Sequence, residues 1–176
     1  MPSEERAERV APSGFRGVVY RATHPDYEDL DRTIEFSKQY PGRFNPPGSG
    51  AVYVALERAT AIAELKRRAE RLGRTVKSFT PRALLTLDVA LRQVLDLTDA
   101  AVRAEWDITL DDLRTEHDYV RCHEVAQVAR RDGYEAIRFP SATGEGVNLA
   151  IFYDQRHTGS YLAVQSSEEL DLDALA

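Results

Sequence analysis

The sequence predicts a single mixed α/β domain, with central mixed or antiparallel sheets and flanking helices. Its 176 residues are 43% apolar and 30% charged, and a chain of this size can bury a substantial core. Short apolar runs alternate irregularly with amphipathic stretches, so the regular β-α-β repetition of a Rossmann sheet is missing. We expect a polar N-terminal tail at 1–14, one domain at 15–165 and an acidic, frayed or partner-facing tail at 166–176.

The overall charge and composition exclude several classes of protein. The formal net charge is -6, so no basic face is expected that could bind nucleic acid directly. The single cysteine excludes an intramolecular disulfide, and four widely spread histidines predict no metal site. No apolar run is long enough to span a membrane, and the composition suits a reducing cytoplasm.

The first half of the chain predicts two strands and two helices. The run 15–23 (FRGVVYRAT) has an apolar centre and is expected to form a strand. Residues 24–40 contain few apolar side chains, which indicates a mobile flap or surface helix over a pocket. Residues 51–56 (AVYVAL) predict a mostly buried strand. The apolar spacing of 59–72 predicts an amphipathic helix, which Gly73 ends.

The second half predicts further strands and two more helices. A strand is expected at 82–90, and residues 94–97 either extend it or form the next strand. Thr98 or Asp99 is expected to cap a helix that runs through Trp106. The acidic stretch 107–118 is expected to be irregular, and we assign it no chemistry. The remaining elements are a helix at 118–132 and strands at 134–139, 147–153 and 160–164.

One stretch, residues 42–64 (GRFNPPGSGAVYVALERATAIAE), brings an arginine, an aromatic ring and a carboxylate to one turn-strand-helix junction. Its glycines and prolines predict an irregular loop that carries Arg43. Tyr53 lies in the strand that follows, and Glu64 lies in the helix, about 120° from the centre of the apolar stripe. Sites are often built where loops meet strand ends, so these three side chains are candidates for one cleft.

Each of these side chains also has a structural alternative. Glu64 would form an ion pair with Arg67 or Arg68, three or four residues along the helix. Tyr53 would pack in the core with a satisfied hydroxyl. Arg43 would brace its loop through backbone carbonyls.

Five more residues outside this stretch carry chemical groups of interest. Arg21 ends the first strand, where a guanidinium either pairs at the surface or grips a pyrophosphate with its bidentate fork. Ser141 lacks a Gly-x-Ser-x-Gly frame, so the pattern favours a turn hydroxyl over a nucleophile. Asn148, at the entry of the next strand, is a secondary candidate that supports the Ser141 loop. Cys122 and His123 are adjacent on a helix and point about 100° apart, which argues against a catalytic thiolate-imidazole pair.

Three segments together resemble the RES domain family, the toxin component of a class of bacterial toxin-antitoxin pairs. They are GRFNPPGSGAVYVALERATAIAE, the preceding VVYRAT and the later RFPSATGEGVNLAIFYD, and the resemblance covers the chain from about Phe15 to Gln165. It implies a fold similar to the ADP-ribosyltransferases and an NAD+ pocket in which the nicotinamide-ribose bond is cleaved. The family's polar positions fall on Arg21, Arg43, Tyr53, Glu64 and Ser141. The resemblance also implies a cognate Xre-like antitoxin that occludes the pocket and supplies any DNA contact.

The bond to be broken suggests a role for each of these side chains. Loss of nicotinamide leaves positive charge on the ribose, with a transition state of oxocarbenium character, and Glu64 would stabilise that charge. Arg21 and Arg43 would clamp the pyrophosphate, Tyr53 would orient the nicotinamide, and Ser141 would bond near the ribose or the amide. NAD+ is then the substrate, and no metal is needed. Water, inorganic phosphate or a protein side chain remains open as the acceptor.

Three functions remain open from the sequence. The first is a type II toxin that degrades NAD+, as a glycohydrolase or phosphorylase, and arrests growth. The second is a protein ADP-ribosyltransferase, which would leave ADP-ribose on a macromolecule. The third is a non-catalytic interaction module in which Glu64 only pairs with neighbouring arginines.

Overall fold

A computed structural model describes residues 13–175 of the chain. The strands are β1 (Ser13–Thr23), β2 (Val52–Ala55), β3 (Ala83–Asp96), β4 (Ala136–Pro140), β5 (Val147–Ile151) and β6 (Tyr161–Glu169). The α-helices are α1 (Leu30–Gln39), α2 (Arg58–Arg71), α3 (Ala100–Glu105), α4 (Leu110–Arg114) and α5 (Val120–Arg131). Short 3-10 turns are η1 (Pro25–Tyr27), η2 (Val76–Phe79) and η3 (Tyr153–Gln155).

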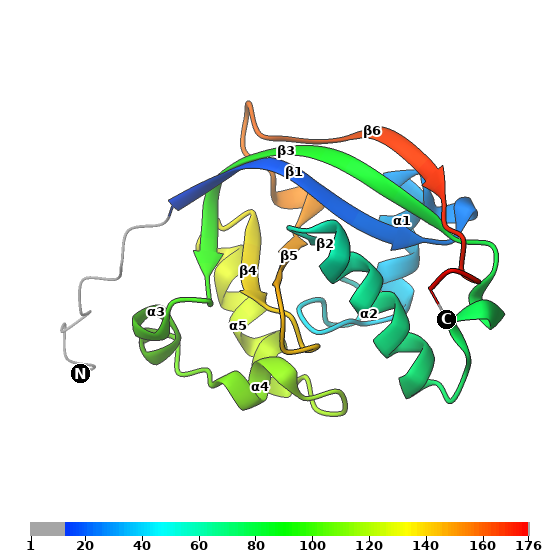
Figure 1. The fold of residues 1–176 in the computed structure, drawn as a ribbon. Coiled ribbons are helices and arrows are strands. Elements are labelled where there is room, and N and C mark those ends of the chain that lie inside the picture. Colours follow the sequence, from blue (N-terminus) through cyan, green and yellow to red (C-terminus); the bar gives the residue numbers. More distant parts are fainter. Residues whose placement is uncertain (1–12, 176) are drawn as a thin grey trace, which may run out of the picture.

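The strands form one six-stranded sheet in the order β1-β2-β5-β4-β3-β6, with a further pairing between β1 and β3. That further pairing closes β1, β2, β5, β4 and β3 into a ring, with β6 added outside on β3. Of the strand pairs, β3 with β4 is parallel and the rest are antiparallel. Figure 1 shows β1, β3 and β6 arching over β2, β5 and β4.

Three apolar clusters hold the sheet and helices together. The second of them lies between the arch of β1, β3 and β6 and the strands β2, β5 and β4 beneath it. It joins Val19 of β1, Val54 of β2 and Leu87 of β3 to Ile34 of α1. The first cluster packs α3, α4 and α5 against β4 and β5, and the third packs α2 against β1 and the chain end. α2 therefore lies beside the seam where β1 meets β2, so the helix that carries Glu64 contacts the two strands that carry Arg21 and Tyr53 (Figure 1).

Residues 24–40 were expected to form a mobile flap or a surface helix, and the structure has the helix, α1, with one face packed. Ile34 is buried in the second apolar cluster, and the Ser37 hydroxyl accepts a hydrogen bond from the backbone of Ala51. Asn45 donates to the Ser37 carbonyl at 2.7 Å. A mobile flap would not make these contacts, and the face of α1 that makes them consists of the buried residues Thr33, Ile34 and Ser37.

One other expectation is wrong, and so is the frayed alternative for the acidic tail. The irregular stretch 107–118 contains α4, whose start is fixed by reciprocal hydrogen bonds between Thr109 and Asp112. The acidic tail is not frayed over most of its length, since β6 runs to Glu169, and Leu170 and Leu172 are buried beside α2. The N-terminal tail call at 1–14 lies outside the described residues except for the last two, which begin β1.

The remaining elements follow the sequence patterns closely. β3 is a single strand that includes both of its predicted parts, and Asp99 caps α3 as expected. Gly73 and Gly133, with φ of 64° and 87°, follow the ends of α2 and α5. In the described part of the chain, no helix is long and apolar enough to cross a membrane.

Candidate functional site

Three polar side chains from separate elements meet at Glu64, and we call them the carboxylate cluster: Glu64, Ser141 and Asn148. The Ser141 hydroxyl donates to Glu64 Oε1 at 2.5 Å, and the Asn148 amide donates to the same oxygen at 2.9 Å. Ser141 is 1% exposed and Asn148 8% exposed. Both donors bind Oε1, and Oε2 has no hydrogen-bond partner among the described residues. The carboxylate is thus fixed in orientation, with one acceptor oxygen left for a ligand.

The loop after β4 reaches α2 because its backbone can lie directly on the helix. The strand ends at Pro140, which has no N–H to continue the ladder, and the Ser141 N–H then donates to the Gly146 carbonyl at 3.0 Å. Gly146 has a φ of 85°, and a Cβ at this position would lie 2.0 Å from the Thr60 hydroxyl of α2. Only glycine allows both this conformation and this approach, which brings Ser141 to Glu64.

Arg21 is half-buried at the seam between β1 and β2. Its Nη1 donates to the Tyr53 carbonyl at 2.9 Å, whereas its buried Nε has no hydrogen-bond partner within residues 13–175. Burial lowers the pKa of Arg21 to about 10, and the positive charge of Arg68 also lowers it. A buried guanidinium with an unused donor is costly, and an anionic ligand would relieve that cost.

The hydroxyl of Tyr53 is occupied inside the protein. It donates to Asn45 Oδ1 at 2.6 Å and accepts from the Phe44 N–H at 2.8 Å, so it braces the Gly/Pro-rich loop. Burial raises the pKa of Tyr53, while the charge of Arg43 opposes that rise. The Tyr53 hydroxyl is therefore satisfied within the protein, as the core-packing alternative expects. The ring remains as the part of the side chain that could contact a ligand.

Arg43 points from its loop towards α4 and α5. Its guanidinium lies 5.0 Å from the centre of the Tyr119 ring, and its Nη1 donates to the Asp112 carbonyl at 3.4 Å. The nearby His123 ring nitrogen Nε2 is 2.7 Å from the Gly42 carbonyl oxygen, which ties α5 to the same loop. Arg43 thus has partial bracing contacts, as its structural alternative expects.

The sequence-predicted residues fall into two groups. Hydrogen bonds join the first group, Glu64, Ser141 and Asn148. The second group is centred on Tyr53, whose carbonyl accepts a hydrogen bond from Arg21 and whose hydroxyl lies within electrostatic range of Arg43. No hydrogen bond or ion pair joins Glu64 to either arginine within residues 13–175. The two groups adjoin, because α2 carries Glu64 and also Arg68, whose charge acts on Arg21.

Arg67 helps to hold the Ser141 loop against α2, a role that the sequence did not indicate. It does not pair with Glu64; its Nε donates to Glu116 at 2.5 Å, and its Nη1 donates to the Ala142 carbonyl. One side chain therefore ties the helix of Glu64 to the Ser141 loop and to the segment before α5. No local pattern could reveal this contact, since Glu116 is 49 residues away and lies in a stretch without assigned chemistry.

Replacing Arg67 with glutamine should loosen the Ser141 loop. The loss of two partly buried, charge-assisted hydrogen bonds is expected to lower the free energy of unfolding by about 1–2 kcal/mol. Amide hydrogen exchange at residues 141–146 should accelerate more than exchange at β3. Glu116→Gln should behave similarly, and Lys66→Gln, at an exposed neighbour on α2, should change neither quantity. Unchanged exchange in Arg67→Gln would show that the contact does not hold the loop.

Cys122 and His123 do not form a catalytic pair. The Cys122 thiol is fully buried and donates to the Asp112 carbonyl at 3.4 Å, and burial raises its pKa to about 11. A thiol in this state is a poor nucleophile, and His123 is engaged with Gly42. The helical spacing had indicated the same outcome.

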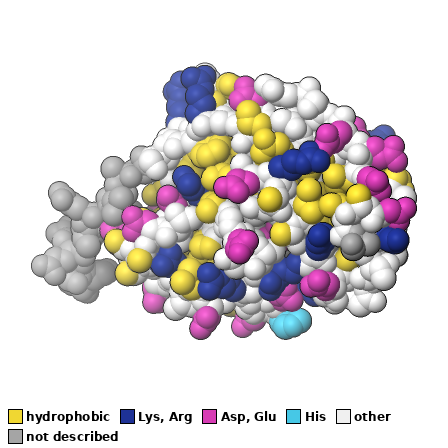
Figure 2. Space-filling view, viewed as in Figure 1, with side chains coloured by type: hydrophobic (Ala, Val, Ile, Leu, Met, Phe, Trp, Pro, Cys, Tyr) yellow, Lys and Arg dark blue, Asp and Glu magenta, His cyan; other side chains and the backbone are white. Residues whose placement is uncertain are grey.

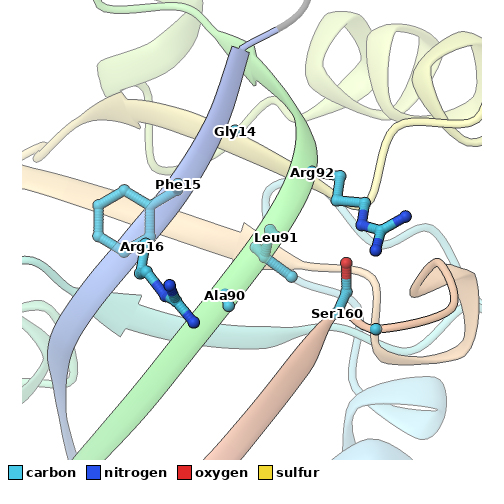
Figure 3. A pocket seen from close by; sticks show the side chains of 8 residues that line it. Gly14, Phe15, Arg16, Ala90, Leu91, Arg92 and Ser160 are labelled. Carbon is cyan, nitrogen blue, oxygen red and sulfur yellow. The ribbon is translucent and has the colours of Figure 1, made fainter.

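Two surface hollows lie away from these residues. One of about 430 Å³ is bounded by β1, β3 and the 159–160 turn, with Arg16 and Arg92 at its sides (Figure 3). The other, of about 530 Å³, lies on η1 and α1. Neither is lined by a candidate residue. Within residues 13–175, no group of three or more side chains is arranged to hold a metal ion.

Comparison with known proteins places the chain in context. A family model described as "RES domain" matches residues 18–173. A chain of the crystal structure of the M. tuberculosis MbcT-MbcA toxin-antitoxin complex superposes with a TM-score of 0.83 at 26% sequence identity. The match covers 93% of this chain and 88% of that chain, and it agrees with an ADP-ribosyltransferase-like fold. No curated protein sequence matches.

Proposed function

This chain belongs to the RES domain family, and we propose that it is the toxin of a type II toxin-antitoxin pair that cleaves the nicotinamide-ribose bond of NAD+. The observation that carries the proposal is the orientation of Glu64. Ser141 and Asn148 hold its Oε1, which leaves Oε2 as the acceptor for a ligand. A carboxylate fixed before the reaction stabilises positive charge without reorganising.

The proposed chemistry needs that fixed charge more than it needs a proton donor. Nicotinamide leaves as a neutral amine while positive charge develops on the ribose, as in other glycosidic cleavages. Glu64 Oε2 would bind the ribose and offset this charge, and the hydrogen bond from Ser141 keeps the carboxylate in place. Asn148 supplies a second anchor, so loss of either donor alone would leave Glu64 partly held.

The two arginines would bind the charged part of the substrate. Arg21 offers an Nε–H without a partner among the described residues, and Arg43 has a long hydrogen bond to the Asp112 carbonyl and contacts with the Tyr119 ring and the Cys122 thiol. Both guanidiniums therefore retain donors for a pyrophosphate, which would hold the ribose in register with Glu64. The Tyr53 ring would contribute a face for the nicotinamide, since its hydroxyl is committed to the loop.

A cognate protein would restrain this activity. The similar M. tuberculosis structure is a toxin-antitoxin complex, and we propose an Xre-like antitoxin that covers the carboxylate cluster here and makes any DNA contact. The net charge of -6 is the reason to assign the DNA contact to the partner and not to this chain. NAD+ and such a partner would meet this chain in the cytoplasm.

Expression of the chain without a partner in bacteria tests the proposal. Cellular NAD+ should fall and growth should stop, and with ADP-ribose-labelled NAD+ the label should appear in a small molecule. Label on protein or nucleic acid would favour ADP-ribosyl transfer instead. Unchanged NAD+ in cells that contain the soluble, folded chain would reject cleavage altogether.

A further inference from the structure

Four arginines gather around the end of α2, and we call them the arginine cluster: Arg68, Arg71, Arg74 and Arg82. Arg68 and Arg71 are three residues apart on α2, which places them on neighbouring turns of one face. Gly73 then ends the helix, and the Arg74 N–H bonds back to the Ala69 carbonyl. Several Lys and Arg side chains lie over α2 in Figure 2.

The ring of Phe79 fixes two members of this cluster. The guanidinium of Arg74 lies 5.2 Å from the ring centre, and that of Arg82 lies 5.0 Å from it. Phe79 is 4% exposed, so it is a rigid support. Two flexible side chains are thereby held near one another, which reduces the entropy lost when a ligand orders them.

The four positive charges are close enough to repel one another. Burial lowers the pKa of Arg82, and the charges of Arg68 and Arg74 lower it further. Burial also lowers the pKa of Arg68, with an added effect from Arg71. Charges at a protein surface act over about 8–10 Å, so the four guanidiniums form one continuous positive region.

No carboxylate offsets this region among residues 13–175. Arg67, on the same helix, is paired with Glu116, and Arg58, at the start of that helix, is paired with Glu168. Even the acidic chain end, which runs beside the cluster, places Asp173 against Lys77 at 3.2 Å. Asp173 therefore pairs outside the cluster, and no ion pair joins a carboxylate to the four arginines within the described residues.

The helix dipole explains only part of this arrangement. Cations near the C-terminus of a helix are favourable, which accounts for Arg68 and Arg71. It does not account for Arg82, which lies 11 positions beyond the helix end, at the start of β3. The chain has a net charge of -6, so a group of four neighbouring arginines is a local exception to its overall charge.

We propose that the arginine cluster is a second anion site that binds a ligand carrying two or more phosphate groups. Planar guanidinium forks match phosphate oxygens, and a polyphosphate concentrates more negative charge in this small area than spaced carboxylates do. This second site is separate from the carboxylate cluster. Glu64 lies near the middle of α2, and the arginine cluster lies at the C-terminal end of that helix. Its charge also reaches Arg21 through Arg68.

Calorimetric titration of the purified full chain with inorganic tripolyphosphate tests this site without any NAD+ cleavage. The wild type should bind tripolyphosphate at the arginine cluster in addition to any bound by Arg21 and Arg43, and Arg71→Gln/Arg74→Gln should weaken binding at the cluster at least tenfold. Both side chains are exposed, so the fold should be retained, as checked by circular dichroism. Arg16→Gln/Arg92→Gln removes the same charge from exposed positions around the hollow of Figure 3, and its affinity should match that of the wild type.

Three results would overturn the proposal. The first is no binding by the wild type, and the second is equal weakening in both double variants, which would reflect overall charge alone. The third is tighter binding of hexaglutamate or a DNA oligonucleotide than of tripolyphosphate, which would indicate an acidic protein or nucleic acid as the ligand. None of these outcomes bears on whether Glu64 serves in NAD+ cleavage.

Discussion

Replacing Glu64 with glutamine is expected to lower kcat for nicotinamide release from NAD+ by about 100-fold or more. The change removes the negative charge with little change in volume, so the fold should persist. Oε1 can still accept from Ser141 and Asn148, but the group that then faces the ribose is an amide without charge. Initial rates of nicotinamide release by the purified variant would measure the loss, and KM should change less than kcat because the arginines still bind the pyrophosphate.

Glu70→Gln is the matched control for this prediction. Glu70 lies on the same helix and is exposed, so the substitution removes the same charge without reaching the site. Its kcat should remain within about twofold of the wild type. Equal rates for the wild type and Glu64→Gln would reject Glu64 as the residue that stabilises the developing charge.

Of the substitutions proposed here, Glu135→Gln should lower the free energy of unfolding most. Glu135 is 0% exposed, and its carboxylate accepts three backbone hydrogen bonds, from Arg92 at 2.6 Å, Gln93 at 3.0 Å and His157 at 2.6 Å. Glutamine has one acceptor oxygen, so its NH2 would face an N–H group and leave a buried donor unpaired. We expect a loss of about 3 kcal/mol in the free energy of unfolding, measured by urea denaturation.

The same residue predicts a dependence of stability on pH. Burial alone raises the pKa of Glu135, but the hydrogen bonds to its carboxylate outweigh burial and hold the pKa below its ordinary value of 4.5. The unfolded chain therefore binds the proton first as pH falls, so this contribution is complete above pH 4.5 and is lost as pH falls through the lower, folded pKa. Glu135→Gln should lack this part of the acid destabilisation.

Exposed Glu145→Gln should leave both stability and its acid dependence unchanged. If Glu135→Gln proves as stable as the wild type at neutral pH, the carboxylate does not hold β3 to β4 and the 157 turn. An equal decline of the wild type and Glu135→Gln on acidification would assign the pH dependence to other groups.

Elements with a clear local signal could be predicted from the sequence. The helix that carries Glu64 was found because its apolar residues recur at helical spacing and Gly73 ends it. The strands β1 and β2 were found from short apolar runs between breakers. In contrast, α4 was missed because five residues give too few turns for a period, and its capping box was the available signal.

The site could be predicted only in part, since long-range contacts leave no local trace. The resemblance named Glu64 and Ser141, and the position of Asn148 at a strand entry made it a candidate, but no pattern indicated that all three would share one oxygen. The structural alternative for Glu64 was reasonable on spacing, yet Arg67 contacts Glu116 and Ala142 instead. Spacing along a helix restricts which residues can meet, while the packing of distant loops decides which do.

Proton NMR of NAD+ incubated with the purified wild-type chain most directly tests the central claim. Signals of free nicotinamide should rise as those of the N-glycosidic nicotinamide fall, one for one, with the adenine part retained in a single ribosyl product. An intact NAD+ spectrum in the presence of folded chain, with water and inorganic phosphate both supplied, would contradict the account.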